Sequence, residues 1–113
     1  MSRKKVNKIT SEITTQARNL LGNNLKAVIL YGSYARGDFD SESDIDIMIL
    51  VKNKESELKA IEKKVSDAVW DIGMENKVFI TAFVNNYDLF NSRLEISPFY
   101  RNVKNDGVEL YAI

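Results

Sequence analysis

Two runs of the chain carry apolar residues at the spacing of an amphipathic helix. In the first, Val6, Ile9, Ile13 and Ala17 recur every three or four positions, which places them on one helix face. Glycine and asparagine at residues 22–24 predict the end of this helix. The second run predicts a longer helix over residues 55–74. Its apolar positions are Leu58, Ile61, Val65, either Ala68 or Val69, and Ile72.

Shorter apolar segments with β-branched residues favour strands, and they alternate with signals for turns and short helices. The strands are expected at residues 26–31, 44–51 and 77–84, with a turn of helix and a loop over residues 33–43. Asn85 and Asn86 predict a turn and a cap for a short helix that runs to residue 94. Ser97 and Pro98 begin another helix, residues 106–107 end it, and residues 108–111 add a last strand.

The second strand segment is the most informative. Side chains alternate between the two faces of a strand, so Asp44, Asp46, Met48 and Leu50 share one face. The other face carries Ile45, Ile47, Ile49 and Val51, so both faces are apolar after Asp46. This pattern is typical of a central strand covered on both sides, except that carboxylates replace hydrocarbon at the first two positions of one face.

The element order predicts an α+β fold, in which helices back a mixed β-sheet within a single domain of residues 1–113. Several large aromatic residues lie in the apolar segments, and we interpret them as core or interface residues rather than as a platform for stacking bases. They are Trp70, Phe79, Phe83, Phe90 and Phe99.

The composition narrows the chemistry. Basic and acidic residues number 16 each, so the net charge is zero and extensive nonspecific nucleic-acid binding is not expected. The chain contains no histidine and no cysteine, which excludes thiolate metal sites and every Ser/His or Cys/His catalytic arrangement. No apolar run is long enough for a signal peptide or membrane span, so the expected location is cytoplasmic.

Four residues between the first two strands form a candidate site. Gly32 ends the first strand and lets backbone amides approach a phosphate, and Ser33 adds a hydroxyl donor. Asp44 and Asp46 place two carboxylates on neighbouring positions of one face, where Mg²⁺ would relieve their repulsion. Taken alone, these aspartates are more typical of ordinary solvent-facing positions at the start of a strand.

The full pattern Gly-Ser, Arg-Gly and Ser-Asp-x-Asp between Tyr31 and Asp46 resembles the minimal nucleotidyltransferases of the polymerase-β-like superfamily. The resemblance implies a polymerase-β palm-like fold and transfer of AMP from ATP to a hydroxyl acceptor with Mg²⁺. Gly32 and Ser33 would hold the triphosphate, and Asp44 and Asp46 would be the catalytic metal ligands. Arg36 is either a phosphate contact or a solvated surface residue.

A third carboxylate completes the metal site in active members of that family, on the strand after the long helix. Residues 77–84 contain no Asp or Glu, and Glu75 is the nearest acidic candidate. A second hypothesis is therefore a weakly active or inactive module that neutralises a partner by binding it.

Small stand-alone members of the family are similar to antitoxins whose partner is a HEPN-domain ribonuclease, and some modify a tyrosine of that partner. The resemblance thus implies a protein partner and a toxin–antitoxin setting. Whether the chain also self-associates stays open. A DNA polymerase or aminoglycoside-modifying activity requires additional domains, which 113 residues do not accommodate.

Overall fold

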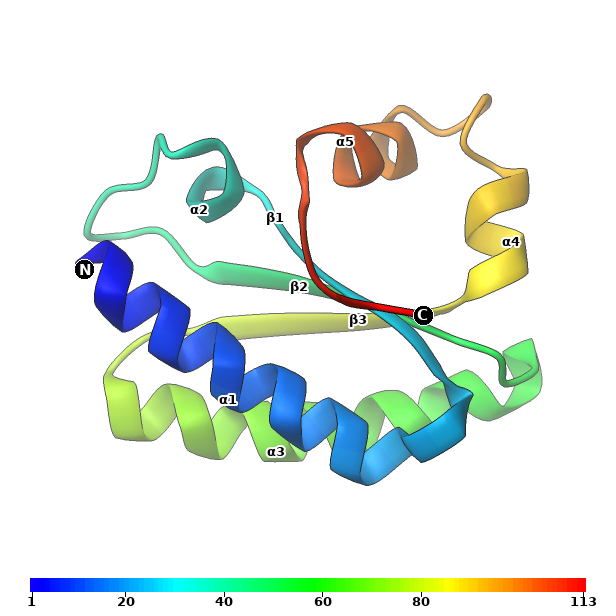
Figure 1. Ribbon diagram of the computed structural model, residues 1–113, viewed down its shortest axis with the longest axis horizontal. Coiled ribbons are helices and arrows are strands. Elements are labelled where there is room, and N and C mark those ends of the chain that lie inside the picture. The colour runs from blue at the N-terminus through cyan, green and yellow to red at the C-terminus, as the bar shows by residue number, and fades with distance from the viewer.

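The computed structural model describes residues 1–113 as one sheet with a layer of helices on each face (Figure 1). Helices α1 and α3 lie against one face, and α4 and α5 lie over the other. The helices are α1 (Arg3–Leu21), α2 (Ser33–Arg36), α3 (Leu58–Asn76), α4 (Tyr87–Ser92) and α5 (Pro98–Asp106). The strands are β1 (Leu25–Tyr31), β2 (Ile45–Val51), β3 (Ile80–Asn86) and β4 (Val108–Ala112). None of the helices combines the length and hydrophobicity that a membrane span requires.

Side-chain caps and left-handed residues set the ends of the helices. The Ser2 hydroxyl accepts from the Lys5 amide at 3.1 Å, so α1 begins three residues before the first apolar position, Val6. Gly22, with φ 53°, ends it as expected. Asn86 and Ser97 cap α4 and α5, which confirms both cap predictions.

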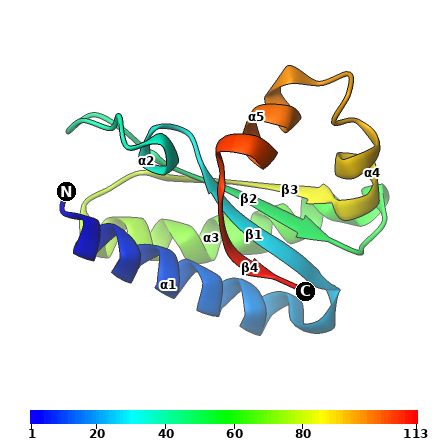
Figure 2. The same ribbon diagram turned by 45° about the horizontal axis from the view of Figure 1, so that its top comes forward.

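The sheet is mixed and has the strand order β3-β2-β1-β4 (Figure 2). Strand β1 pairs antiparallel with both β2 and β4, whereas β2 pairs parallel with β3. The predicted α+β class and the last strand are therefore confirmed. Strand β3 forms one edge of the sheet, and β2 is internal.

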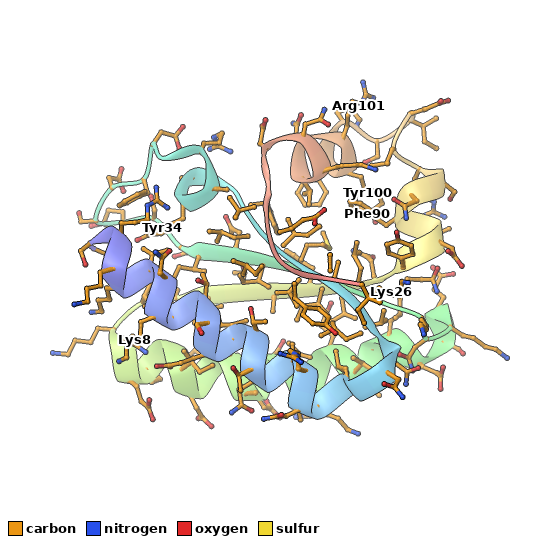
Figure 3. All side chains as sticks on the ribbon, viewed as in Figure 1. Lys8, Lys26, Tyr34, Phe90, Tyr100 and Arg101 are labelled. Atoms are coloured by element: carbon orange, nitrogen blue, oxygen red, sulfur yellow. The ribbon has the colours of Figure 1, made fainter.

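Strand β2 separates two hydrophobic cores. Ile45, Ile47, Ile49 and Val51 are fully buried against α1 and α3. Met48 and Leu50 point the other way, into a smaller core with Phe90 and Val103. There Phe90 of α4 and Tyr100 of α5 face each other with ring centroids 5.0 Å apart (Figure 3). The prediction of a central strand covered on both faces is confirmed.

The predicted start of the strand after α3 is wrong. Strand β3 begins at Ile80 rather than residue 77, because Lys77 adopts a left-handed conformation and the Val78 amide bonds back to Gly73 O at 3.0 Å. This turn leaves Phe79 outside the strand and 66% exposed. Trp70 is 57% exposed and so lies outside the core, because it is one position, about 100° around the helix, from buried Val69. Of the predicted alternatives, core or interface, the interface role of Trp70 stays a prediction.

Phe83 and Phe99 also lie outside the core, at 48% and 47% exposed, and Phe90 is the one buried residue among the five aromatic residues. For the exposed four, the alternative of an interface residue stays a prediction. Phe83 lies on the edge strand, and Phe99 lies in the first turn of α5. Edge and helix-end positions are covered on fewer sides than a central strand, which explains their exposure.

Because β2 is buried on both faces, truncating one of its core side chains should destabilise the fold. Ile47→Ala should lower the free energy of unfolding by about 2–5 kcal/mol, because a fully buried isoleucine leaves a cavity. Denaturant unfolding followed by circular dichroism measures this. Ile96→Ala, at a position 78% exposed, should change the free energy by less than about 0.5 kcal/mol. Equal effects of the two substitutions would contradict the assignment.

Candidate active site

Gly32 follows β1 and packs directly against a carboxylate of β2. Its φ of 75° lies in the region that L side chains rarely adopt. A Cβ at this position would overlap Asp46 Oδ2. Glycine is therefore required both by the backbone conformation and by the space that Asp46 occupies.

The turn after Gly32 forms the short helix α2. The Ala35 and Arg36 amides each donate to Gly32 O at 3.1 Å. The first amides of a helix have no intrahelical acceptor, and half-buried Ser33 is the first residue of α2. Tyr34 is buried and stacks on Phe39 with centroids 4.4 Å apart, so it packs beneath the loop (Figure 3).

Asp46 is oriented by a hydroxyl from the neighbouring parallel strand. In the β2–β3 register Asp46 is opposite Thr81, and Thr81 Oγ1 donates to Asp46 Oδ1 at 2.6 Å. A charge-assisted bond of this length is among the stronger hydrogen bonds in proteins. The sequence did not single out Thr81, because its position beside Asp46 depends on the pairing of two distant strands.

Asp44 lies one residue before β2, because the first ladder bond joins the Ile45 amide to Phe79 O at 2.9 Å. Its exposed side chain lines a surface groove that Thr81 also lines. Gly32 borders Asp46 from the side of β1, and Thr81 borders it from the side of β3. Gly32, Asp46 and Thr81 thus form a continuous row across the end of the sheet, and Asp44 lies two residues before Asp46.

Arg36 lies at the far end of α2 and is exposed. Its Nε donates to Asp38 Oδ2 at 3.3 Å, within the same solvated loop. Asp38, Asp40 and Glu42 are exposed as well, as expected for loop charges.

Glu75 does not complete a set of three carboxylates. It lines a cleft between α1 and α3 together with Ser11 and Glu12. Side chains alternate along β2, so Asp46 shares the opposite face of the sheet with Met48 and Leu50. No group of three or more His, Cys, Asp or Glu residues in the structure could hold a metal ion. The position nearest Asp46 on β3 is the hydroxyl of Thr81.

Burial and the aspartates shift the pKa of two tyrosines in the row's surroundings. Burial, and secondly the charge of Asp46, raise the pKa of Tyr31 to about 12. The pKa of Tyr34 is also raised, by burial and then by Asp40 and Asp44. Both phenols stay neutral at physiological pH and so pack beside the carboxylates without adding charge.

Comparison with known families identifies the family of the chain. A model of the family described as Polymerase beta, Nucleotidyltransferase matches residues 7–112. The chain belongs to the polymerase beta nucleotidyltransferase family. The resemblance seen in the sequence is thereby confirmed, and the activity class of this enzyme is nucleotidyl transfer.

Curated relatives support the same class. The putative protein adenylyltransferase MJ0604 of Methanocaldococcus jannaschii is 36% identical over 104 residues, covering 92% of this chain and 96% of the relative. The putative protein adenylyltransferase MJ0141 of the same organism is 52% identical over 44 residues, covering 39% of this nucleotidyltransferase and 44% of that protein.

Two solved structures share the fold of the nucleotidyltransferase. One is a toxin–antitoxin crystal structure with AMP-PNP, with a TM-score of 0.56 and 18% identity, covering 92% of this chain and 73% of that chain. The other is a mutant of the toxin–antitoxin MntA-HpeT, with a TM-score of 0.55 and 17% identity over the same coverage. At this identity the likeness establishes the fold alone.

The proximity of Asp46 to Tyr31 predicts a coupled titration. Between pH 10 and about 12 the unfolded chain has lost the Tyr31 proton and the folded chain has kept it. The free energy of unfolding should therefore fall as the pH rises through this window. Asp46→Asn should lower the pKa of Tyr31 without restoring it fully, because burial is the larger cause.

Phenolate absorbance against pH measures this shift, and Tyr31→Phe identifies the signal of Tyr31. Asp67→Asn, on the exposed face of α3, serves as the control and should leave the titration unchanged. If Tyr31 has the same pKa in the wild type and in Asp46→Asn, the charge of Asp46 does not act on Tyr31 and the prediction is wrong.

Proposed function

We propose that the chain transfers AMP from ATP, with Mg²⁺, to a hydroxyl group of a partner protein. The hydroxyl oxygen bonds to the α-phosphorus, the bond between the α- and β-phosphates breaks, and pyrophosphate and the hydroxyl proton are released. The observation that carries the proposal is the packing of the Gly32 turn against Asp46, which puts a phosphate-binding turn and a carboxylate at one point. The names of the curated relatives, putative protein adenylyltransferases, support the nucleotide and the class of acceptor.

The residues present fit a divalent cation shared with a nucleotide. Asp44 and Asp46 supply hard oxygen ligands, and Mg²⁺ commonly takes one or two carboxylates together with substrate phosphates and water. Thr81 holds Asp46 through its 2.6 Å bond and so limits the rotation of that carboxylate. When bound, the cation would neutralise charge on the phosphates.

The chain itself would bind and orient the triphosphate. The first amides of α2 and the Ser33 hydroxyl are donors at the end of β1, and the missing side chain at Gly32 allows close approach. Arg36, which bonds to Asp38 in the free chain, would add a secondary phosphate contact after exchanging that partner. Such donors hold an α-phosphate in line with an incoming hydroxyl.

The absence of a third carboxylate beside Asp46 favours an acceptor hydroxyl with a low pKa. Without a third carboxylate beside Asp46, a hydroxyl with a low pKa needs least help from a base, and a tyrosine phenol has a pKa near 10. We therefore propose a tyrosine as the acceptor and a HEPN-domain toxin as the partner, in a toxin–antitoxin pair. The fold shared with toxin–antitoxin structures, one of them with AMP-PNP, supports this setting.

A second candidate function is neutralisation of the partner by binding alone. The observation that favours it is the hydroxyl of Thr81 at the place beside Asp46 where a third acidic ligand would complete the metal site. Catalysis and occlusion differ in their dependence on Asp44 and Asp46, because only catalysis requires the carboxylates.

The two candidates can be separated by substitution. Asp44→Asn and Asp46→Asn should each lower transfer of labelled AMP from ATP to the co-produced partner roughly 100-fold or more, because each removes a metal ligand. Thr81→Val should lower it about 10-fold, since Asp46 loses its orienting donor. Asp67→Asn is the matched control and should transfer at the wild-type rate.

Suppression of the partner's toxicity is measured in parallel in cells. If Asp44→Asn combined with Asp46→Asn still suppresses the partner while labelling is lost, binding alone accounts for the function. If neither labelling nor suppression depends on the two aspartates, the proposed active site is wrong.

A further inference from the structure

An apolar groove lies at the edge of the sheet where α3 meets β3. It has a volume of about 440 Å³, and its walls come from α3, the turn after it and the start of β3. Three large side chains along it are open to solvent, Trp70 at 57%, Met74 at 61% and Phe79 at 66%. Large exposed apolar side chains clustered in a groove mark an interaction site more often than scattered ones do.

The groove continues into the proposed active site. Asp44 and Thr81 line one end of it, and Thr81 donates to Asp46. The groove therefore meets the proposed active site at Asp44 and Thr81. The Gly32 turn, where we place the triphosphate, borders Asp46 and so leaves the groove free for the second substrate.

The backbone beside the groove is free to pair with an extended chain. Strand β3 has a neighbour on one side only. Because the Ile45 amide bonds to Phe79 O, the backbone groups of Ile80 and Ala82 point away from β2, toward the open edge. Further along, the Glu62 carboxylate accepts from the Val84 amide at 2.9 Å and covers that edge. The uncovered part of the edge coincides with the groove.

These features favour a polypeptide over other occupants. An open strand edge next to apolar pockets is the arrangement used in recognition by strand addition. A nucleic acid would need cations along its path, whereas Lys77 is the one basic residue in the lining and Asp44 lies in the same wall.

We propose that this groove binds an extended segment of the acceptor protein. A bulky apolar side chain of that segment packs against Trp70, Met74 and Phe79, and the acceptor hydroxyl, a few residues away, lies at Asp46. The inference rests on the proposed function and adds a sequence preference to it: the modified residue has a large apolar neighbour.

Kinetics with the labelled acceptor test the groove. Trp70→Glu and Met74→Glu should each raise KM for the acceptor protein at least about tenfold and leave kcat within about twofold, because the groove binds but does not react. Ile96→Glu, at an apolar position 78% exposed and outside the groove, is the matched control and should leave both constants unchanged. Unchanged KM in both groove variants would overturn the proposal.

Fluorescence gives a readout that does not need turnover, because Trp70 is the only tryptophan of the chain. Two synthetic tyrosine peptides serve as probes, identical except for leucine or serine two residues from the tyrosine. The leucine peptide should shift the Trp70 emission to shorter wavelength at a concentration at least about tenfold lower than the serine peptide. Equal responses, or no response to either peptide, would overturn the proposal.

The kinetic and the fluorescence experiments together distinguish an error in the groove proposal from an error in the proposed transfer of AMP. If the wild-type chain labels no protein but distinguishes the peptides, the transfer proposal fails and the groove remains a peptide site. Size-exclusion chromatography measures the oligomeric state of the wild type and of Trp70→Glu. If the wild type is a dimer and Trp70→Glu is a monomer, a second copy of this chain occupies the groove and the acceptor proposal is overturned.

Discussion

The contact between Gly32 and the Asp46 carboxylate is the constraint on which the rest of the site depends. It joins the turn after β1 to the start of β2, and it exists only because these strands are antiparallel with Tyr31 opposite Asp46. In this pairing the end of one strand meets the beginning of the next. A turn that can hold phosphates and a carboxylate that can hold a cation are thus brought together by the sheet register.

The two cores around β2 keep that register in place. The strand buries isoleucines against α1 and α3 and buries Met48 and Leu50 on the opposite face. A one-residue slip would turn both sets of side chains toward the wrong core. Asp46 is the exception in this buried strand, and Thr81 and the neutral phenol of Tyr31 accommodate its charge. The site is therefore built at the start of the strand that is buried on both faces.

Much of this arrangement could be predicted from local sequence, because it depends on periodicity and on short spacings. The alternation in residues 44–51 identified the central strand, and the Gly-Ser and Asp-x-Asp spacing identified the family. Thr81 could not be found in this way, since no local pattern encodes the parallel register of β2 with β3. Glu75 was misleading because closeness to β3 in sequence does not reveal which face of the sheet a helix covers. Trp70 missed the core by one position on its helix.

Binding of Mg²⁺-ATP at the Gly32–Asp46 contact is the central claim, and amide chemical shifts test it residue by residue. In a ¹⁵N-labelled chain, Mg²⁺-ATP should move the amide signals of Gly32, Ser33, Ile45 and Thr81. Signals along the α1–α3 cleft near Glu75 should stay in place, and Asp46→Asn should weaken the response strongly. Shifts confined to the α1–α3 cleft, or a response that Asp46→Asn leaves unchanged, would contradict the account.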